Sequence, residues 1–236
     1  MYSEFDIKAP FFEIGPKAYI YGEESVKLAV AADEAAQKYD VDIIYTALSV
    51  DIPAIAAATT RLKVFAQHMD GIEVGRGIGM SVAEALKEAG AHGTMLNHAE
   101  RPMALSDIHK AIKRADEAGL ATLVCADTPE EACAIAHLEP NMILAESPDL
   151  IGGGVRQESD MDKIAQTNEA ISKINPKIMV MHSAGITDGR DVYAVIAKGA
   201  DATGSTSGII KAQNPHAMVE EMIRAVRNAY DERNGD

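Results

Sequence analysis

The clearest architectural signal lies in residues 121–145, which read ATLVCADTPEEACAIAHLEPNMILA. Two short runs of apolar and β-branched residues, Ala121–Cys125 and Met142–Ala145, enclose a stretch with helical spacing, Pro129–Ala136. Thr128 comes directly before Pro129, the usual order of an N-terminal cap and a first-turn proline. A strand, a helix and a second strand of these lengths predict a βαβ unit, in which the two strands are parallel.

The same alternation continues in both directions along the chain. Short apolar or aromatic runs predict eight strands, at Phe11–Ile14, Asp42–Ala47, Lys63–Ala66, Gly93–Leu96, Ala121–Cys125, Met142–Ala145, Lys177–Met181 and Ala202–Gly204. Helical spacing predicts eight helices, at Glu23–Tyr39, Asp51–Thr60, Ser81–Ala89, Ser106–Glu117, Pro129–Ala136, Asp160–Ile174, Asp188–Ala197 and Pro215–Tyr230. Ser106 is expected to cap a helix that ends at Gly119, and Gly90 and Gly199 stand where helices commonly end.

Eight such units of about 30 residues each predict an α/β fold, a (β/α)8 barrel in which residues 1–236 form a single domain. A doubly wound open sheet is the alternative arrangement. Both folds gather the side chains that follow the strands at one edge, so we expect the functional site at the carboxyl ends of the strands.

Composition and charge exclude several classes of protein. The chain is 47% hydrophobic and 25% charged, and its 22 basic and 36 acidic residues give a formal net charge of −14. This acidic balance argues against nucleic acid and against anionic membrane surfaces as partners, because both select basic faces. Two cysteines cannot form a disulfide framework, and the acidic first ten residues do not resemble a signal peptide. We therefore expect a soluble, cytoplasmic protein.

Several chemically active residues directly follow the predicted strands. They are Lys17, Gln67, His68, Asp70, Asn97, His98, Glu100, Asp127, Glu146, His182, Thr206 and Ser207. The segment 146–154 mixes a proline, apolar residues and three glycines, as a hinged loop over a site would. The glycine-bearing segments after the seventh and eighth strands lie where barrels commonly bind phosphate through backbone N–H groups.

Three of these residues suit proton transfer beside a carbonyl group. A carboxylate such as Glu146 can remove a proton, and an imidazole such as His98 can polarise a carbonyl or move a proton between adjacent oxygens. An ammonium group such as Lys17 can stabilise a developing oxyanion. The simpler interpretations are a surface lysine, a helix-capping histidine and a solvated glutamate.

Five segments together form a recognisable set of motifs: residues 91–101, AHGTMLNHAER, Glu146–Gly154, VFAQH at 64–68, SAGI at 183–186 and SGIIKA at 207–212. Through these motifs the sequence resembles the triosephosphate isomerase family, and within it the short archaeal-type members. These motifs stand in the family's order and spacing across almost the whole chain.

The resemblance implies a (β/α)8 barrel that interconverts glyceraldehyde 3-phosphate and dihydroxyacetone phosphate, as in glycolysis and gluconeogenesis, with no cofactor and no metal. It implies that Lys17 stabilises an enediolate, His98 acts as the electrophile, Glu146 moves the proton, and Glu100 supports them. The positions that would surround the substrate and its phosphate are Gly15, Ile151, Gly152, Gly185, Thr206 and Ser207. It also implies a homo-oligomer, either a dimer or a tetramer.

Three single positions and one short segment depart from the family pattern. Gly15 replaces a substrate-binding asparagine, and Ile78 replaces the threonine of an interface loop that supports that asparagine. Ala99 replaces a serine, and the segment 202–205, ATGS, is small and polar where the family is apolar. These departures predict a wider and more polar pocket.

Other functions stay open at this point. The same chemistry on a four- or five-carbon sugar phosphate is one alternative, and a non-catalytic binder of phosphorylated ligands on the same barrel is another. A metal site built from His68, Asp70, His98, Glu146 and His182 is a third, although their spacing lacks the tight His-x-His or His-x-x-x-His pattern. A Schiff base on Lys17 is a fourth.

Overall fold

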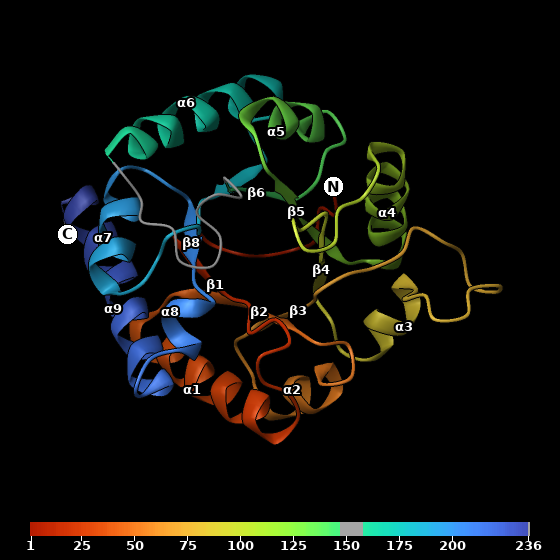
Figure 1. Cartoon of the computed structure of the whole chain (residues 1–236), viewed down its shortest axis with the longest axis horizontal. Helices are drawn as coiled ribbons and strands as arrows, with labels where there is room; N and C mark the ends of the chain where they lie inside the picture. The colour runs from red at the N-terminus through yellow and green to blue at the C-terminus, as the bar shows by residue number, and fades with distance from the viewer. Residues whose placement is uncertain (147–157, 236) are drawn as a thin grey trace.

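The computed structural model describes residues 1–146 and 158–235, with the backbone alone for 158–163. Within these residues, parallel strands β1 to β8 close a barrel in chain order, and β1 pairs with β8 (Figure 1). The strands are β1 Phe11–Ile14, β2 Asp42–Ala47, β3 Lys63–Ala66, β4 Gly93–Leu96, β5 Ala121–Ala126, β6 Met142–Ala145, β7 Met179–Met181 and β8 Ala202–Gly204. The predicted (β/α)8 barrel is therefore confirmed, and the open sheet is wrong.

The helices form the outer ring (Figure 1). They are α1 Glu23–Tyr39, α2 Ile52–Ala58, α3 Ala83–Glu88, α4 Leu105–Ala118, α5 Pro129–Ala136, α6 Glu158–Ile174, α7 Gly189–Ala197, α8 Ser207–Ile210 and α9 Pro215–Asn234. Thr128 caps α5 as predicted, since its hydroxyl accepts the Glu131 N–H. Ser106 does not cap α4, because Ala104 is the capping residue and the helix has already begun at Leu105.

Two separate apolar clusters hold the barrel together. The outer cluster fills the space between strands and helices. The inner one consists of alternate strand residues that point into the barrel, namely Phe11, Ile44, Phe65, Met95, Ala121, Leu123, Cys125, Met142, Leu144, Met181 and Ala202. Because side chains alternate along a strand, Glu13 of β1 lies on the same inward face as Phe11, one layer closer to the carboxyl end. The barrel interior is therefore apolar at its base and acquires a carboxyl group below its mouth.

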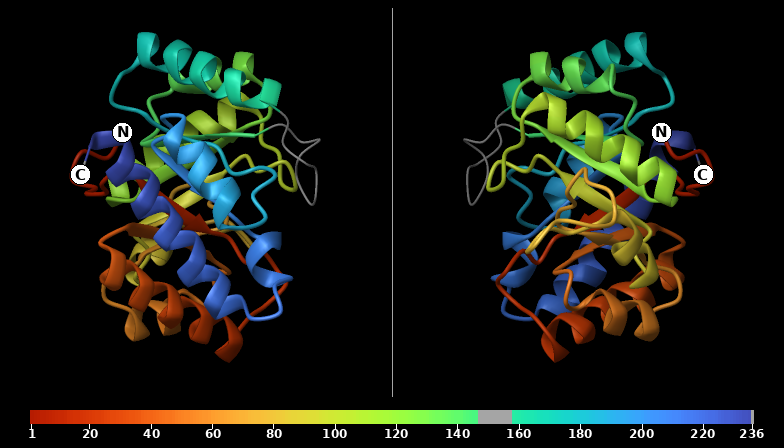
Figure 2. Two further views of the ribbon diagram at one scale, coloured as in Figure 1. Left: turned by 90° about the vertical axis from the view of Figure 1, so that its left-hand side faces the viewer. Right: turned by 90° about the vertical axis from the view of Figure 1, so that its right-hand side faces the viewer.

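The N-terminal segment closes the base of the barrel. Phe5 packs edge-on against Phe65, with ring centroids 5.6 Å apart, and the Tyr2 carbonyl accepts a hydrogen bond from Asn141 Nδ2. Both termini lie at this end, and the carboxyl ends of the strands face the opposite way (Figure 2). Across the described residues, no helix combines the length and apolar character that a bilayer crossing requires.

Candidate functional site

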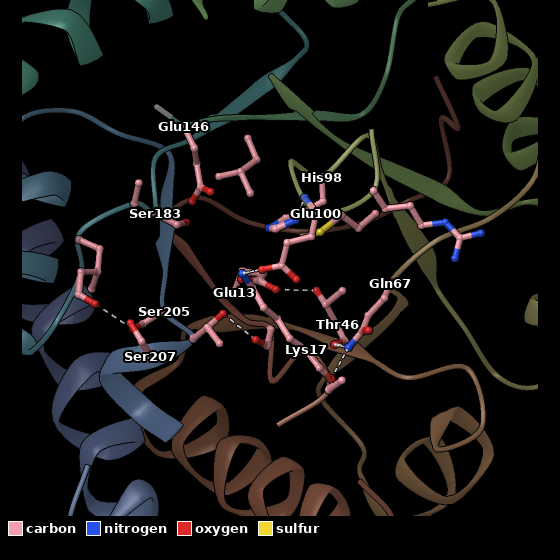
Figure 3. Close-up of a pocket in the computed structure, with 18 of the residues that line it drawn as sticks. Glu13, Lys17, Thr46, Gln67, His98, Glu100, Glu146, Ser183, Ser205 and Ser207 are labelled. Atoms are coloured by element: carbon pink, nitrogen blue, oxygen red, sulfur yellow. Dashed lines mark hydrogen bonds and ion pairs between the residues drawn. The ribbon is translucent and has the colours of Figure 1, made fainter. Parts of the chain in front are cut away.

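A cavity of about 290 Å³ opens at the carboxyl ends of the strands. Ten of the residues expected from the sequence line it together: Gly15, Lys17, Gln67, His68, His98, Glu100, Glu146, Gly185, Thr206 and Ser207. Glu13, Thr46 and Ser183 also line it (Figure 3), as do Met95 and Leu144. Two expected residues, Ile151 and Gly152, lie outside the described residues.

The backbone of Lys17 is held in an unusual conformation just after β1. Its φ of 52° lies in the left-handed region, which costs energy for a residue with a side chain. Gln67 compensates from the end of β3, because its Nε2 donates to the carbonyl oxygens of both Lys17 and Thr46. The Lys17 ammonium forms an ion pair with Glu100 Oε1 at 2.5 Å. Lys17 is thus anchored at both its backbone and its charged end.

The loop that carries His98 is built around Asn97. This residue adopts a left-handed φ of 57° and is buried. Its Nδ2 donates to Cys125 O at 3.0 Å and to Glu131 Oε1 at 2.9 Å, and its Oδ1 accepts the Met103 N–H at 2.8 Å. Asn97 therefore ties the loop to β5 and α5, which fixes where His98 projects into the cavity.

The hydrogen bonds of His98 determine which ring nitrogen can donate to a ligand. Nδ1 accepts the Glu100 backbone N–H at 3.1 Å, so this nitrogen carries no proton. Burial and the neighbouring Lys17 lower the pKa of His98, whereas Glu100 and Asp127 oppose that change. The imidazole is accordingly neutral near pH 7, with its proton on Nε2, where it can polarise a carbonyl oxygen.

Two carboxyl groups approach the cavity from the strands. Glu146 directly follows β6, where its N–H donates to Ala126 O, and it lines the cavity. Glu13 lies inside the barrel with 4% of its surface exposed, and Thr46 Oγ1 donates to its Oε1 at 2.6 Å. Burial raises the pKa of Glu13 to about 7, and the charge of Glu146 adds to that effect against the opposing effects of Thr46 and Lys17. Burial therefore favours the protonated form of Glu13 below about pH 7.

The opposite wall of the cavity is made of backbone and small polar side chains. Gly185 has a φ of 78°, and Thr206 and Ser207 begin the short helix α8. Thr206 Oγ1 donates to Gly15 O at 2.6 Å, which joins this wall to the end of β1. Such a surface suits the predicted phosphate position, because backbone N–H and hydroxyl groups can bind an oxyanion.

The residues of the proposed metal site do not gather around one point. His68 Nε2 lies 3.1 Å from Asp70 Oδ1, and His182 Nε2 lies 2.8 Å from Asn168 Oδ1. In the part of the chain that the structure describes, no group of three or more His, Cys, Asp and Glu side chains could hold a metal ion.

Glu13 and Ser183 were not among the candidates that follow the strands. Glu13 lies within a strand and not after one, although a single carboxylate in an apolar strand, two residues before Gly15, is a usable signal. Ser183 Oγ is buried without a hydrogen-bond partner in the described structure, a feature that only coordinates reveal.

The fold and the cavity define a (β/α)8-barrel protein with acid–base side chains at the carboxyl ends of its strands. A family model for triosephosphate isomerase matches residues 14–226. A triosephosphate isomerase of Methanosarcina mazei is 36% identical over 221 residues, covering 92% of this chain and 99% of the relative. One from Sulfurisphaera tokodaii is also 36% identical, over 228 residues that cover 95% and 99%. The chain belongs to the triosephosphate isomerase family.

A solved structure agrees on the fold. The triosephosphate isomerase of Bartonella henselae superposes with a TM-score of 0.74, covering 94% of this chain and 99% of that chain at 15% sequence identity. At this identity the likeness concerns the barrel architecture.

Proposed function

We propose that this protein is an intramolecular oxidoreductase that interconverts glyceraldehyde 3-phosphate and dihydroxyacetone phosphate. The observation that carries the proposal is that Lys17, His98 and Glu146 line one cavity in a chain that belongs to the triosephosphate isomerase family. The relatives matched over more than nine-tenths of this chain bear that name.

Each of the three side chains supplies one requirement of the reaction. The Glu146 carboxylate removes a proton from the carbon beside the substrate carbonyl and later delivers a proton to the neighbouring carbon. The His98 Nε2–H polarises the carbonyl oxygen and serves the proton exchange between the two oxygens. The Lys17 ammonium stabilises the negative enediolate between these steps. No redox cofactor is needed, because the substrate is oxidised at one carbon and reduced at the next.

Glu100 and the small polar wall complete the proposed site. Glu100 orients the Lys17 ammonium through the ion pair and the His98 ring through its backbone N–H. Gly185, Thr206 and Ser207 receive the phosphate, and the predicted contribution of Ile151 and Gly152 belongs to the same proposal.

We also propose a homo-oligomer, a cytoplasmic location and a single domain over residues 1–236. The segment between β3 and α3 exposes three apolar side chains, Val74, Ile78 and Met80, which supports burial against a second copy. Cys125 and Cys133 are free thiols, as is usual in a reducing compartment. The continuous closed barrel supports one domain.

The proposal is tested by assaying purified protein with triose, tetrose and pentose phosphates beside the Glu146→Gln variant. We expect the wild-type protein to interconvert the trioses fastest and the variant to lose that turnover. If a tetrose or pentose phosphate is turned over faster than the trioses, that longer sugar phosphate is the substrate. Tight binding without turnover of any of them would make the protein a binder instead of an isomerase.

A further inference from the structure

Among the described residues that line the cavity, Glu13 has a buried carboxyl group that the proposed mechanism does not use. It lies in the middle of β1, opposite Ile44 of β2 and Gly204 of β8. Below it on the inward face is Phe11, and the inner apolar cluster includes its neighbours Ile44 and Met181. A carboxyl group is costly in such surroundings, and an apolar side chain of similar size would pack there at lower cost.

The hydrogen bonds of Glu13 leave much of its carboxyl unused. In the described structure the Thr46 hydroxyl gives this side chain its hydrogen bond, at Oε1. A carboxyl group in its protonated form carries one donor and several acceptor positions, so a donor and further acceptors remain for a group in the cavity. Glu13 lines that cavity with Lys17 and Glu146, and Figure 3 shows it between Thr46 and the groups around Lys17.

The absence of a side chain at Gly15 gives the Glu13 carboxyl its place. A Cβ on Gly15 would lie 2.6 Å from Glu13 Oε1, so any side chain there would displace the carboxyl. A Cβ on Gly204 would lie 2.5 Å from the backbone oxygen of Glu13 and 2.8 Å from Met181 Cε, so Gly204 allows β1 and Met181 to approach β8 closely. Neither glycine therefore leaves an empty space, and the space beside Gly15 is occupied by the Glu13 carboxyl. The pocket becomes more polar there through a carboxyl group.

We propose that Glu13 is a further substrate-binding residue, whose carboxyl donates a hydrogen bond to a hydroxyl or carbonyl oxygen of a phosphorylated sugar at the cavity floor. This inference rests on the proposed function for the class of ligand. It assigns Glu13 to the sugar portion, because the phosphate wall of Gly185, Thr206 and Ser207 belongs to other strands. Glu13 is accordingly a specificity residue that distinguishes a hydroxylated ligand from phosphate alone.

Two probes separate this role from a structural one. Glycerol 3-phosphate carries sugar-like hydroxyls and does not react, whereas inorganic phosphate carries none. Titration calorimetry at pH 6.5 compares the wild-type protein with Glu13→Met, Glu13→Ala and Glu13→Gln. We expect Glu13→Met and Glu13→Ala to lower the affinity for glycerol 3-phosphate at least tenfold, whereas the affinity for phosphate should stay within twofold of the wild-type value. Glu13→Gln retains a donor and should stay within about threefold for both.

Cys125→Ala serves as the control, because Cys125 lies in the inner cluster without lining the cavity, and it should leave both affinities within twofold. The inference is overturned if a folded Glu13→Met or Glu13→Ala variant binds glycerol 3-phosphate like the wild type, or loses both ligands equally. It is also overturned if the wild type does not bind glycerol 3-phosphate. These affinities do not depend on turnover. If the wild type fails to isomerise trioses but the Glu13 variants selectively lose affinity for glycerol 3-phosphate, the proposed reaction is wrong and the proposed contact of Glu13 with the ligand stands.

Discussion

Replacing Glu13 by glutamine should change how the stability of the protein depends on pH. A glutamate normally ionises near pH 4.5, and burial raises the pKa of Glu13 to about 7. Between these values the folded state holds a proton that the unfolded state releases, so wild-type stability falls as pH rises through this window. The gap corresponds to about 3 kcal/mol of unfolding free energy. Glutamine is neutral at every pH and can still accept from Thr46.

The measurement is the free energy of unfolding from urea titrations at pH 4.5, 5.5, 6.5, 7.5 and 8.5 for both proteins. The advantage of Glu13→Gln over the wild type should grow by about 3 kcal/mol between pH 4.5 and 7.5 and then level off. Glu100→Gln is the control, because Lys17 lowers the pKa of Glu100 from its ordinary value of 4.5 and its effect on stability is therefore complete near the lowest pH of the series. The difference between Glu100→Gln and the wild type should stay nearly constant from pH 5.5 to 8.5. A difference for Glu13→Gln that stays within 1 kcal/mol across the range would refute a carboxyl buried in its protonated form.

Three further substitutions address the site. Glu146→Gln should lower kcat about 10²–10⁴-fold in a triose isomerisation assay with little change in melting temperature, since it removes the base. A loss below tenfold would contradict that role. His98→Gln should lower kcat about 10²–10³-fold, and a higher KM at unchanged kcat would count against an electrophile. Gly15→Ala should destabilise the wild type by about 1–3 kcal/mol in urea unfolding, because the new Cβ meets Glu13 Oε1. That cost should largely disappear in a Glu13→Ala background, and equal costs in both would disprove the steric conflict.

The architecture was predictable because it repeats. Each strand is a short apolar run and the longer helices show helical spacing of their apolar residues, so an error at a single boundary does not change the barrel. The errors that occurred have local causes. Ser106 matches a capping residue by type, but α4 begins one residue earlier and places it in the first turn. The helix α8 spans four residues, which is too short for a periodic pattern.

The site was predictable where residues follow strands and match a family motif. Lys17, His98 and Glu146 meet this condition, and the structure gathers them in one cavity. Glu13 does not meet it, because its contribution depends on which face of β1 points inward and on the absence of side chains at Gly15 and Gly204. Such a relation between neighbouring strands requires their register, which the linear sequence does not state.

The most direct test of the account follows hydrogen at carbon during isomerisation. Dihydroxyacetone phosphate is incubated with the protein in D₂O, and the sugar phosphates are followed by NMR over many turnovers. Proton transfer through Glu146 predicts that carbon-bound deuterium accumulates in the triose phosphate pool, and that Glu146→Gln abolishes this incorporation. Interconversion with complete retention of the original hydrogen, or undiminished incorporation in the variant, would contradict it.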